Sequence, residues 1–389
     1  MIVFSRRDLA RLFAPLLARL APLPIRNAVA QPSNRAKLKM SLAQEFARSS
    51  VKAISPDGKK LCVEDWSEHG YPLRVLEIGS WRSIYNGHFQ SRTLSVGFFG
   101  DSRALLVQAL GSIGKEACGV GKGNCAQLET VIELRGGEHT ERMLPINVNQ
   151  GETYWPLGAG VVLDAHREGN HYRTETLALV EFPALREILK VQYAPKPREP
   201  KRRKGNFELS NDFGLGVSDN RGVVAYSFDH TLLCRRTEDL GVLWTRQIEP
   251  RLNAYKVVVS ARGSHVAAAI SDGGFTPFEQ RVSYIAVYSG ETGRDVARLP
   301  QSGTEGIALS PDGDLIAVVA REPGKKGEVV PTVHIYETLS GRELASIAHD
   351  RVQSVRRQFL ESGCTVAFTS DGQHLVTSGL ATKVWRMGE

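Results

Sequence analysis

Residues 306–318 read GIALSPDGDLIAV, and this short stretch decides the fold of the chain. Apolar residues lead into Ser310-Pro-Asp-Gly313 and resume directly after it. Proline presets the backbone of a tight turn, aspartate hydrogen-bonds across it, and glycine tolerates a positive φ. The pattern therefore predicts a β-hairpin.

The same hairpin pattern recurs along the chain. Residues 51–63 read VKAISPDGKKLCV and residues 365–376 read TVAFTSDGQHLV. Weaker copies lie at 94–107, 215–226 and 257–268.

A second unit follows the hairpin within each period. Residues 285–299 read IAVYSGETGRDVARL and parallel residues 333–347, which read VHIYETLSGRELASI. Gly293 and Gly341 of these two copies are 48 residues apart. Two hairpins in a period of that length make one four-stranded blade, and such periods are typical of a β-propeller.

Residues 46–389 resemble the WD40-repeat family and its bacterial relatives. Gly87-His88 matches the family's Gly-His dipeptide, and Val384-Trp385-Arg386 stands where Trp-Asp is expected, with Arg in place of Asp. Most blades lack both dipeptides, and the family's His–Asp–Ser–Trp network is poorly matched. The Ser-Pro-Asp-Gly turns also resemble those of TolB-like and lactonase-like propellers.

We predict an all-β chain that forms a β-propeller of seven four-stranded blades, closed by an N-terminal strand. The expected blades span 46–90, 91–146, 151–192, 207–252, 253–301, 302–349 and 350–389. The last blade shows three obvious strands, so we expect an N-terminal segment to supply the fourth. The candidate strand is residues 37–48, which overlaps a lead-in segment at 31–45. Residues 46–389 are expected to form a single domain, with a solvated, basic, proline-rich loop at 194–206.

The formal charge of +7 is local. Residues 1–30 carry +4 and residues 196–204 carry +5, which leaves −2 on the remaining chain. A body without a general basic surface is not suited to neutralising phosphates, so we expect no nucleic-acid partner. The run at 196–204 is interpreted as a solvated spacer, with contact to an anionic surface or a nuclear-import signal as alternatives.

Residues 1–30 have the parts of an export signal. Ser5-Arg6-Arg7-Asp8-Leu9 resembles the twin-arginine signal, and Ala28-Val29-Ala30 offers a small-residue cleavage site. Arg11 and Arg19 interrupt the apolar region, and the uncharged run 12–18 is too short to span a bilayer. We predict that the protein is exported, in a bacterium to the periplasm, and that the mature chain has no transmembrane helix. One alternative is an N-terminus that is retained in a cytoplasmic or eukaryotic protein. Another is a mitochondrial transit peptide.

The five cysteines show no Cys-x-x-Cys spacing, which argues against a zinc ribbon or a thioredoxin-type site. Cys118 and Cys125 flank the glycine-rich residues 119–124. This pair is the disulfide candidate if the protein is exported, and two free thiols if it is cytosolic.

The usual catalytic signatures are missing from the sequence. It contains no Gly-x-Ser-x-Gly elbow, Walker loop or Cys-x-x-Cys-His site, so we assign no catalytic residue and no cofactor. Two polar clusters, 64–69 and 164–171, lack a standard ligand pattern, and we assign no metal. Trp244 and the turn at Thr292-Gly293 faintly resemble the blade-docking pattern of quinoproteins, although an ordinary turn with a packing tryptophan is the favoured interpretation.

The loops expected on one face of the ring are long and varied, and such loops are where binding residues tend to lie. They span 66–71, 111–124, 166–173, 273–278 and 322–327. The partner-binding candidates are Trp66, His69, Tyr71, Phe275 and Phe278. We therefore favour a non-enzymatic binding or assembly scaffold with a protein partner. The alternative is an exported propeller enzyme, a lactonase-like or other hydrolase, with its site on the ring axis.

Overall fold

The computed structural model describes residues 38–388, apart from 66–70, 90–92, 113–124, 136–137, 147–152, 158–160, 168–173, 182–183, 185, 193–213, 229, 251, 273–282, 302–303, 324–328, 350–364 and 380. The chain divides into two compact units, 1–34 and 35–389, and all described residues belong to the second. The predicted signal segment at 1–30 and the basic loop at 194–206 thus lie outside the described residues. No helix in the described part of the chain could cross a membrane.

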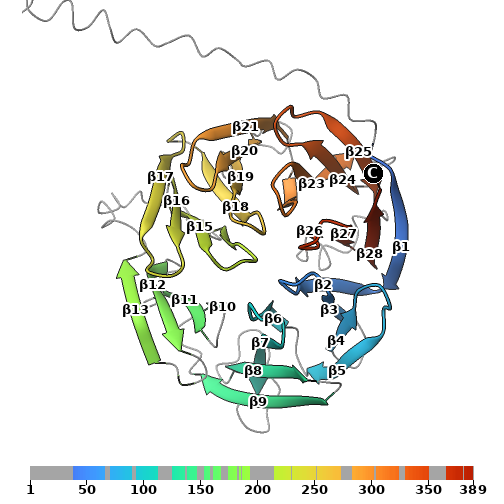
Figure 1. The fold of residues 1–389 in the computed structure, drawn as a ribbon, viewed down its shortest axis with the longest axis vertical. Helices are drawn as coiled ribbons and strands as arrows, with labels where there is room; N and C mark the ends of the chain where they lie inside the picture. Colours follow the sequence, from blue (N-terminus) through green and yellow to red (C-terminus); the bar gives the residue numbers. More distant parts are fainter. Residues whose placement is uncertain are drawn as a thin grey trace, which may run out of the picture. The chain divides into compact units, whose positions relative to one another are not determined.

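The described strands form seven antiparallel four-stranded sheets that follow one another around a ring in chain order (Figure 1). Blade 1 consists of β2 (Ser49–Ile54), β3 (Lys60–Asp65), β4 (Tyr71–Glu77) and β5 (Ser83–Phe89). Blade 2 consists of β6 (Thr93–Phe98), β7 (Ala104–Ser112), β8 (Cys125–Arg135) and β9 (Glu138–Ile146). Blade 3 consists of β10 (Thr153–Pro156), β11 (Val161–Arg167), β12 (Thr174–Glu181) and β13 (Arg186–Gln192).

Blades 4 to 6 repeat this arrangement, each with four consecutive strands. Blade 4 consists of β14 (Leu215–Val217), β15 (Val223–Phe228), β16 (Thr231–Arg236) and β17 (Val242–Gln247). Blade 5 consists of β18 (Asn253–Val259), β19 (His265–Ser271), β20 (Ser283–Ser289) and β21 (Asp295–Pro300). Blade 6 consists of β22 (Thr304–Leu309), β23 (Leu315–Pro323), β24 (Val329–Glu337) and β25 (Glu343–Ala348).

Blade 7 joins the two ends of the ring. It contains β26 (Thr365–Phe368), β27 (His374–Ser378), β28 (Ala381–Met387) and, as its outer strand, β1 (Met40–Ala47). β1 pairs with β28 from Met40 opposite Met387 to Ala47 opposite Ala381 (Figure 1). The fold is a seven-bladed β-propeller closed by an N-terminal strand, and the predicted fold class is confirmed.

The turns between the first and second strands of the blades follow from their sequence. The hydroxyl of Ser55 donates to the carboxylate of Asp57 at 2.5 Å and accepts from the Lys60 amide at 2.8 Å, while the Gly58 amide donates to the Ser55 carbonyl. Gly58 has a φ of +70°, which glycine adopts without strain. The same hydroxyl-centred turn starts at Ser218, Ser310 and Thr369.

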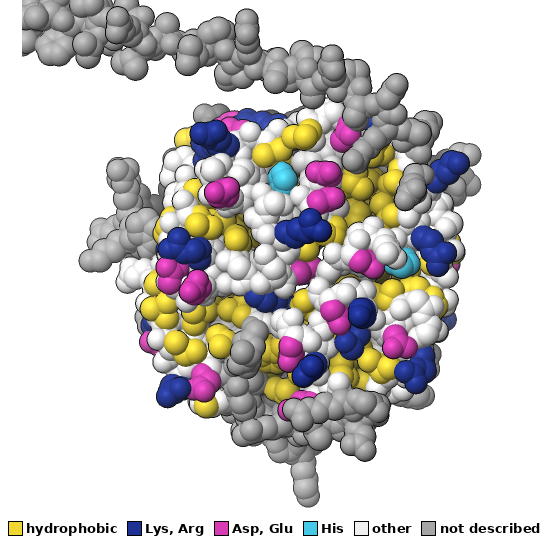
Figure 2. Space-filling model, in the orientation of Figure 1, with side chains coloured by type: hydrophobic (Ala, Val, Ile, Leu, Met, Phe, Trp, Pro, Cys, Tyr) yellow, Lys and Arg dark blue, Asp and Glu magenta, His cyan; other side chains and the backbone are white. Residues whose placement is uncertain are grey.

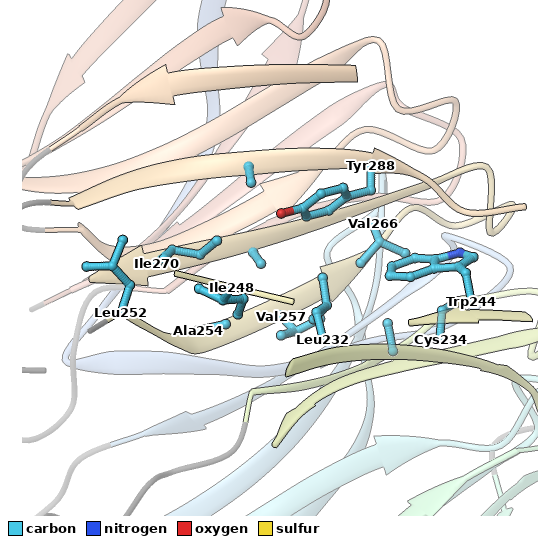
Figure 3. Packing of buried hydrophobic residues seen from close by; sticks show 13 residues of the cluster. Leu232, Cys234, Trp244, Ile248, Leu252, Ala254, Val257, Val266, Ile270 and Tyr288 are labelled. Atoms are coloured by element: carbon cyan, nitrogen blue, oxygen red, sulfur yellow. The ribbon is translucent and has the colours of Figure 1, made fainter. Parts of the chain in front are cut away.

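The hydrophobic core lies between the blades, because each of its seven clusters combines residues of two neighbouring sheets. Figure 3 shows the layer between blades 4 and 5, where Leu232 and Trp244 meet Val257, Val266 and Tyr288. Middle strands are covered on both faces, which explains continuous apolar runs such as β19.

Candidate functional site

The two ends of the blades carry different connections. In an up-and-down sheet, successive connections lie at opposite ends of the strands. The first-to-second and third-to-fourth turns therefore share one side, which we call the turn side. The remaining connections, within and between blades, share the opposite loop side. The longest gaps between described strands, 113–124, 193–213 and 350–364, are all connections of the loop side.

The predicted partner-binding residues belong to loop-side connections. Tyr71 begins β4, where it is half-buried and lies opposite Phe89 of β5. Trp66, His69, Phe275 and Phe278 lie outside the described residues. Their predicted role stays a prediction.

The disulfide prediction also stays untested. Cys125 begins β8, with its backbone opposite Ser112 of β7, and Cys118 lies outside the described residues. Cys62 and Cys234 are buried free thiols, and burial raises the pKa of both, that of Cys234 to about 12. These two thiols are therefore poor nucleophiles at neutral pH.

Two acidic residues of the predicted 64–69 cluster have partners within blades 1 and 2. Glu64 is fully buried, accepts from the Thr93 amide and hydroxyl at 2.8 and 2.7 Å, and pairs with the Lys52 ammonium at 2.7 Å. Asp65 forms a two-point ion pair with Arg74, with N–O distances of 2.6 and 2.7 Å. Both carboxylates hold neighbouring strands together. Within the described ranges, no three metal-ligating side chains are grouped suitably for an ion.

The turn of blade 4, residues 218–222, reaches across the ring axis. Asp219 accepts a hydrogen bond at 2.8 Å from the Ser370 hydroxyl, which belongs to the turn of blade 7. The Arg221 guanidinium donates through Nη2 to the Phe98 carbonyl at the end of β6 in blade 2, at 2.7 Å. One turn thus contacts two blades that are not its neighbours.

The electrostatics of this turn reflect its position inside the ring. Burial raises the pKa of Asp219, and the Ser370 hydrogen bond and the charge of Arg221 partly offset that rise. Burial likewise lowers the pKa of Arg221, against the stabilising charge of Asp219. Each group therefore favours the presence of the other in its charged form.

The ring closes through the β1–β28 pairing of blade 7 and the contacts of blade 7 with blade 1, which together we call the seam. Trp81 packs edge-on against Phe46 of β1 and against His374 of β27, with ring centroids 6.2 and 6.3 Å apart. The Thr382 hydroxyl donates to the Ser49 carbonyl at 3.1 Å, and the Val51 amide donates to the Ser378 hydroxyl at 3.2 Å. These contacts add to the β1–β28 pairing.

A polar chain resembling three members of the WD40 structural network occurs in blade 7. The Thr377 hydroxyl hydrogen-bonds Nε2 of His349 and accepts from the Trp385 indole at 3.0 Å. His349 follows the last strand of blade 6 and is buried. Gly87 and His88, which match the family's dipeptide in sequence, instead lie within the outer strand β5, and the His88 side chain is exposed.

Trp244 connects blades 4 and 5 by a hydrogen bond as well as by packing. Its indole donates to the Gly290 carbonyl at 2.8 Å, and its ring packs beside Gly293 and Tyr288 (Figure 3). A Cβ on Gly293 would lie 2.6 Å from the indole. The sequence pattern at 240–244 and 292–293 therefore marks an inter-blade contact.

Figure 2 shows one face of the molecule, on which Lys and Arg side chains alternate with Asp and Glu side chains and with small hydrophobic areas. The described residues of this face do not gather a single sign of charge. This distribution agrees with the local origin of the net positive charge.

The cross-ring role of Asp219 and Arg221 was not predicted from the sequence. The available signal was a departure from the repeat, because blade 4 has Ser218-Asp-Asn-Arg221 where the strongest copies have Ser-Pro-Asp-Gly. For His349 the available signal was its position in the sequence, directly before the last predicted blade.

Comparisons with known proteins support the fold. No protein-family model matches the chain, and no curated protein matches it by sequence. Among solved structures, KlHsv2 with its loop 6CD replaced by a Gly-Ser linker is similar with a TM-score of 0.55 and 13% identity, covering 88% of this chain and 98% of that one. The Cps50 (Swd1) β-propeller domain of Myceliophteria thermophila gives a TM-score of 0.55 and 10% identity, covering 90% of this chain and 99% of its own.

The chain thus has the fold of a WD40-like β-propeller. At 13% identity or less, this likeness shows the fold alone.

Proposed function

We propose that this chain is a non-catalytic binding or assembly module that contacts a protein partner with loop-side residues. The observation that carries the proposal is the contrast between the two sides of the ring. Turn-side connections are short and hydrogen-bonded within themselves, as at Ser55 and Ser310. Loop-side connections instead range from a single residue, Arg48 between β1 and β2, to the 22 residues between β13 and β14, and their composition differs from blade to blade.

Aromatic side chains among these connections are suitable anchors for a partner. Trp66, Tyr71, Phe275 and Phe278 belong to loop-side connections of blades 1 and 5 or to their flanks. Aromatic residues bury large areas at small entropic cost and dominate the energetics of many interfaces. The rigid ring would hold such anchors in fixed relative positions.

The proposal is tested by covalent capture in the native host. Wild type, Trp66→Ala and Phe278→Ala would be compared after crosslinking in cells, with the thermal unfolding of each variant measured in parallel. We expect both variants to retain the unfolding temperature and to lose captured partner by about tenfold, as for an interface anchor worth more than 1 kcal/mol.

Leu339→Ala provides the matched control. Leu339 is 67% exposed in the turn between β24 and β25, on the turn side. We expect this variant to capture the partner like the wild type. Undiminished capture by both loop-side variants would refute the proposal.

We further propose that the chain is exported after removal of residues 1–30. The intact mass of the native protein under non-reducing conditions tests this proposal. We expect a species that begins at Gln31 and lacks two hydrogens because of a Cys118–Cys125 bond. A full-length species with five free thiols would contradict export and favour a cytosolic scaffold.

A further inference from the structure

The turn of blade 4 departs from its repeat at two positions. The second turn residue is uncharged in the equivalent turns, namely Pro56, Gly100, Ala261, Pro311 and Ser370 in blades 1, 2, 5, 6 and 7, whereas blade 4 has Asp219. The fourth is glycine with a positive φ in blades 1, 5, 6 and 7, whereas blade 2 has Ser102 at a φ of +59° and blade 4 has the larger Arg221 at a φ of +57°. An arginine in this conformation is strained relative to glycine, so the local turn does not account for its presence.

Both departing side chains make their hydrogen bonds outside their own blade. The Asp219 carboxylate accepts a hydrogen bond from the Ser370 hydroxyl of blade 7, and the Arg221 guanidinium donates one to the Phe98 carbonyl of blade 2. Ser370 has one hydroxyl hydrogen, and the 2.8 Å bond to Asp219 is better placed to use it than the 3.4 Å approach to the Ser55 carbonyl. Because the acceptor is a carboxylate, this hydrogen bond is stronger than one to a neutral acceptor.

Blades 7, 1 and 2 are themselves linked around the seam. A Cβ on Gly58 of blade 1 would lie 3.2 Å from the backbone nitrogen of Ser370, so these two turns are in close contact. The Asp57 amide donates to the Ser102 hydroxyl of blade 2 at 3.1 Å. The turn of blade 4 therefore joins the two ends of a chain of contacts that runs across the seam.

We propose that residues 218–222 form an axial strap, which couples the ring-closing blade to the opposite side of the ring and restrains opening of the seam. In this role Asp219 holds the turn of blade 7, and Arg221 holds the inner strand of blade 2. Separation of β28 from β1 would free the rest of blade 7, with its turn, to move away from blade 1, and the strap opposes that displacement.

The test is hydrogen exchange of the full chain under native conditions, measured on peptides that cover 40–47, 381–387, 215–228 and 265–271. Asp219→Ala removes the acceptor of the bond, and Ser370→Ala removes its donor by deleting only a hydroxyl. We expect amides of β1 and β28 to exchange about tenfold faster or more in both variants, as for loss of a hydrogen bond to a charged group. The double variant should be no faster than either single one.

Asp239→Ala is the matched control, because Asp239 lies in the same blade and pairs with Arg236 within its own exposed turn. Its seam exchange should equal that of the wild type. Unchanged exchange at the seam in both strap variants, faster exchange restricted to 215–228, or equal acceleration of the central strand at 265–271 would each overturn the proposal.

Discussion

Trp81 occupies a backbone conformation that the corresponding turns of blades 5 and 6 give to glycine. Its φ is +57°, and Gly293 and Gly341 have φ values of +65° and +66° in the same third-to-fourth turn. Where the turn has glycine, the preceding blade supplies a large side chain, Trp244 or Leu299, against it. At Trp81 the turn itself supplies the large side chain. The inter-blade volume is filled in either case, as close packing requires.

We predict that Gly293→Ala lowers the free energy of unfolding by roughly 2–4 kcal/mol. The added Cβ would lie 2.6 Å from the Trp244 indole and would also sit at a positive φ. Urea denaturation monitored by tryptophan fluorescence measures the loss.

Gly79→Ala separates the two causes of that loss. Gly79 also has a positive φ, and a Cβ there would meet no heavy atom within 4 Å. This variant should lose only about 1–2 kcal/mol from backbone strain. Equal losses in the two variants would mean that the Trp244 contact does not restrict residue 293.

The strands at the seam contain a histidine whose titration should affect stability. Burial lowers the pKa of His374 from its usual 6.5; Asp371 opposes this shift and Arg386 adds to it. The unfolded chain therefore takes up a proton on this residue at a higher pH than the folded chain does. We predict that the free energy of unfolding decreases as pH falls through about 6.5, and that this contribution levels off below the folded pKa.

The pH dependence of His374→Gln tests this assignment. Urea unfolding at several pH values between 7.5 and 5 should give a smaller decrease for the variant than for the wild type. Other titrating groups contribute to both proteins and cancel in the difference. Parallel curves for the two proteins would contradict a role of His374 in the acid sensitivity of the seam.

The elements could be predicted because their signals are local. Turns similar to Ser-Pro-Asp-Gly recur along the chain between apolar strands, and each predicted blade contains strands of one observed sheet. Contacts between distant repeats have no such local signal. The partner of Asp219 is Ser370, on the far side of the ring, and only the unexpected residues at the blade 4 turn marked the site. His349 similarly acts in a blade other than the one it follows.

Ring closure can be tested on the whole molecule by two truncations. A chain lacking residues 1–37 retains β1, and we predict that it unfolds at the temperature of the full chain. A chain lacking residues 1–47 loses every partner of β28 in the β1–β28 pairing, together with Phe46. Because this exposes the edge of β28, we predict aggregation or loss of a single cooperative transition, measured by calorimetry and light scattering.

A peptide of residues 38–48 added to the shorter chain distinguishes loss of the strand from general damage. If closure by β1 is the missing element, the peptide should restore cooperative unfolding. A fully cooperative shorter chain without the peptide would show that the six complete blades and three remaining strands suffice.

The pairing of β1 with β28 also orders events during biosynthesis. β1 leaves the ribosome among the first segments of the domain, and its partner at 381–387 leaves among the last. At about 5–20 residues per second, the first strand waits on the order of tens of seconds for its neighbour. The final blade can therefore assemble only after residues 381–387 have been translated, and premature termination anywhere upstream leaves a chain with no closed ring.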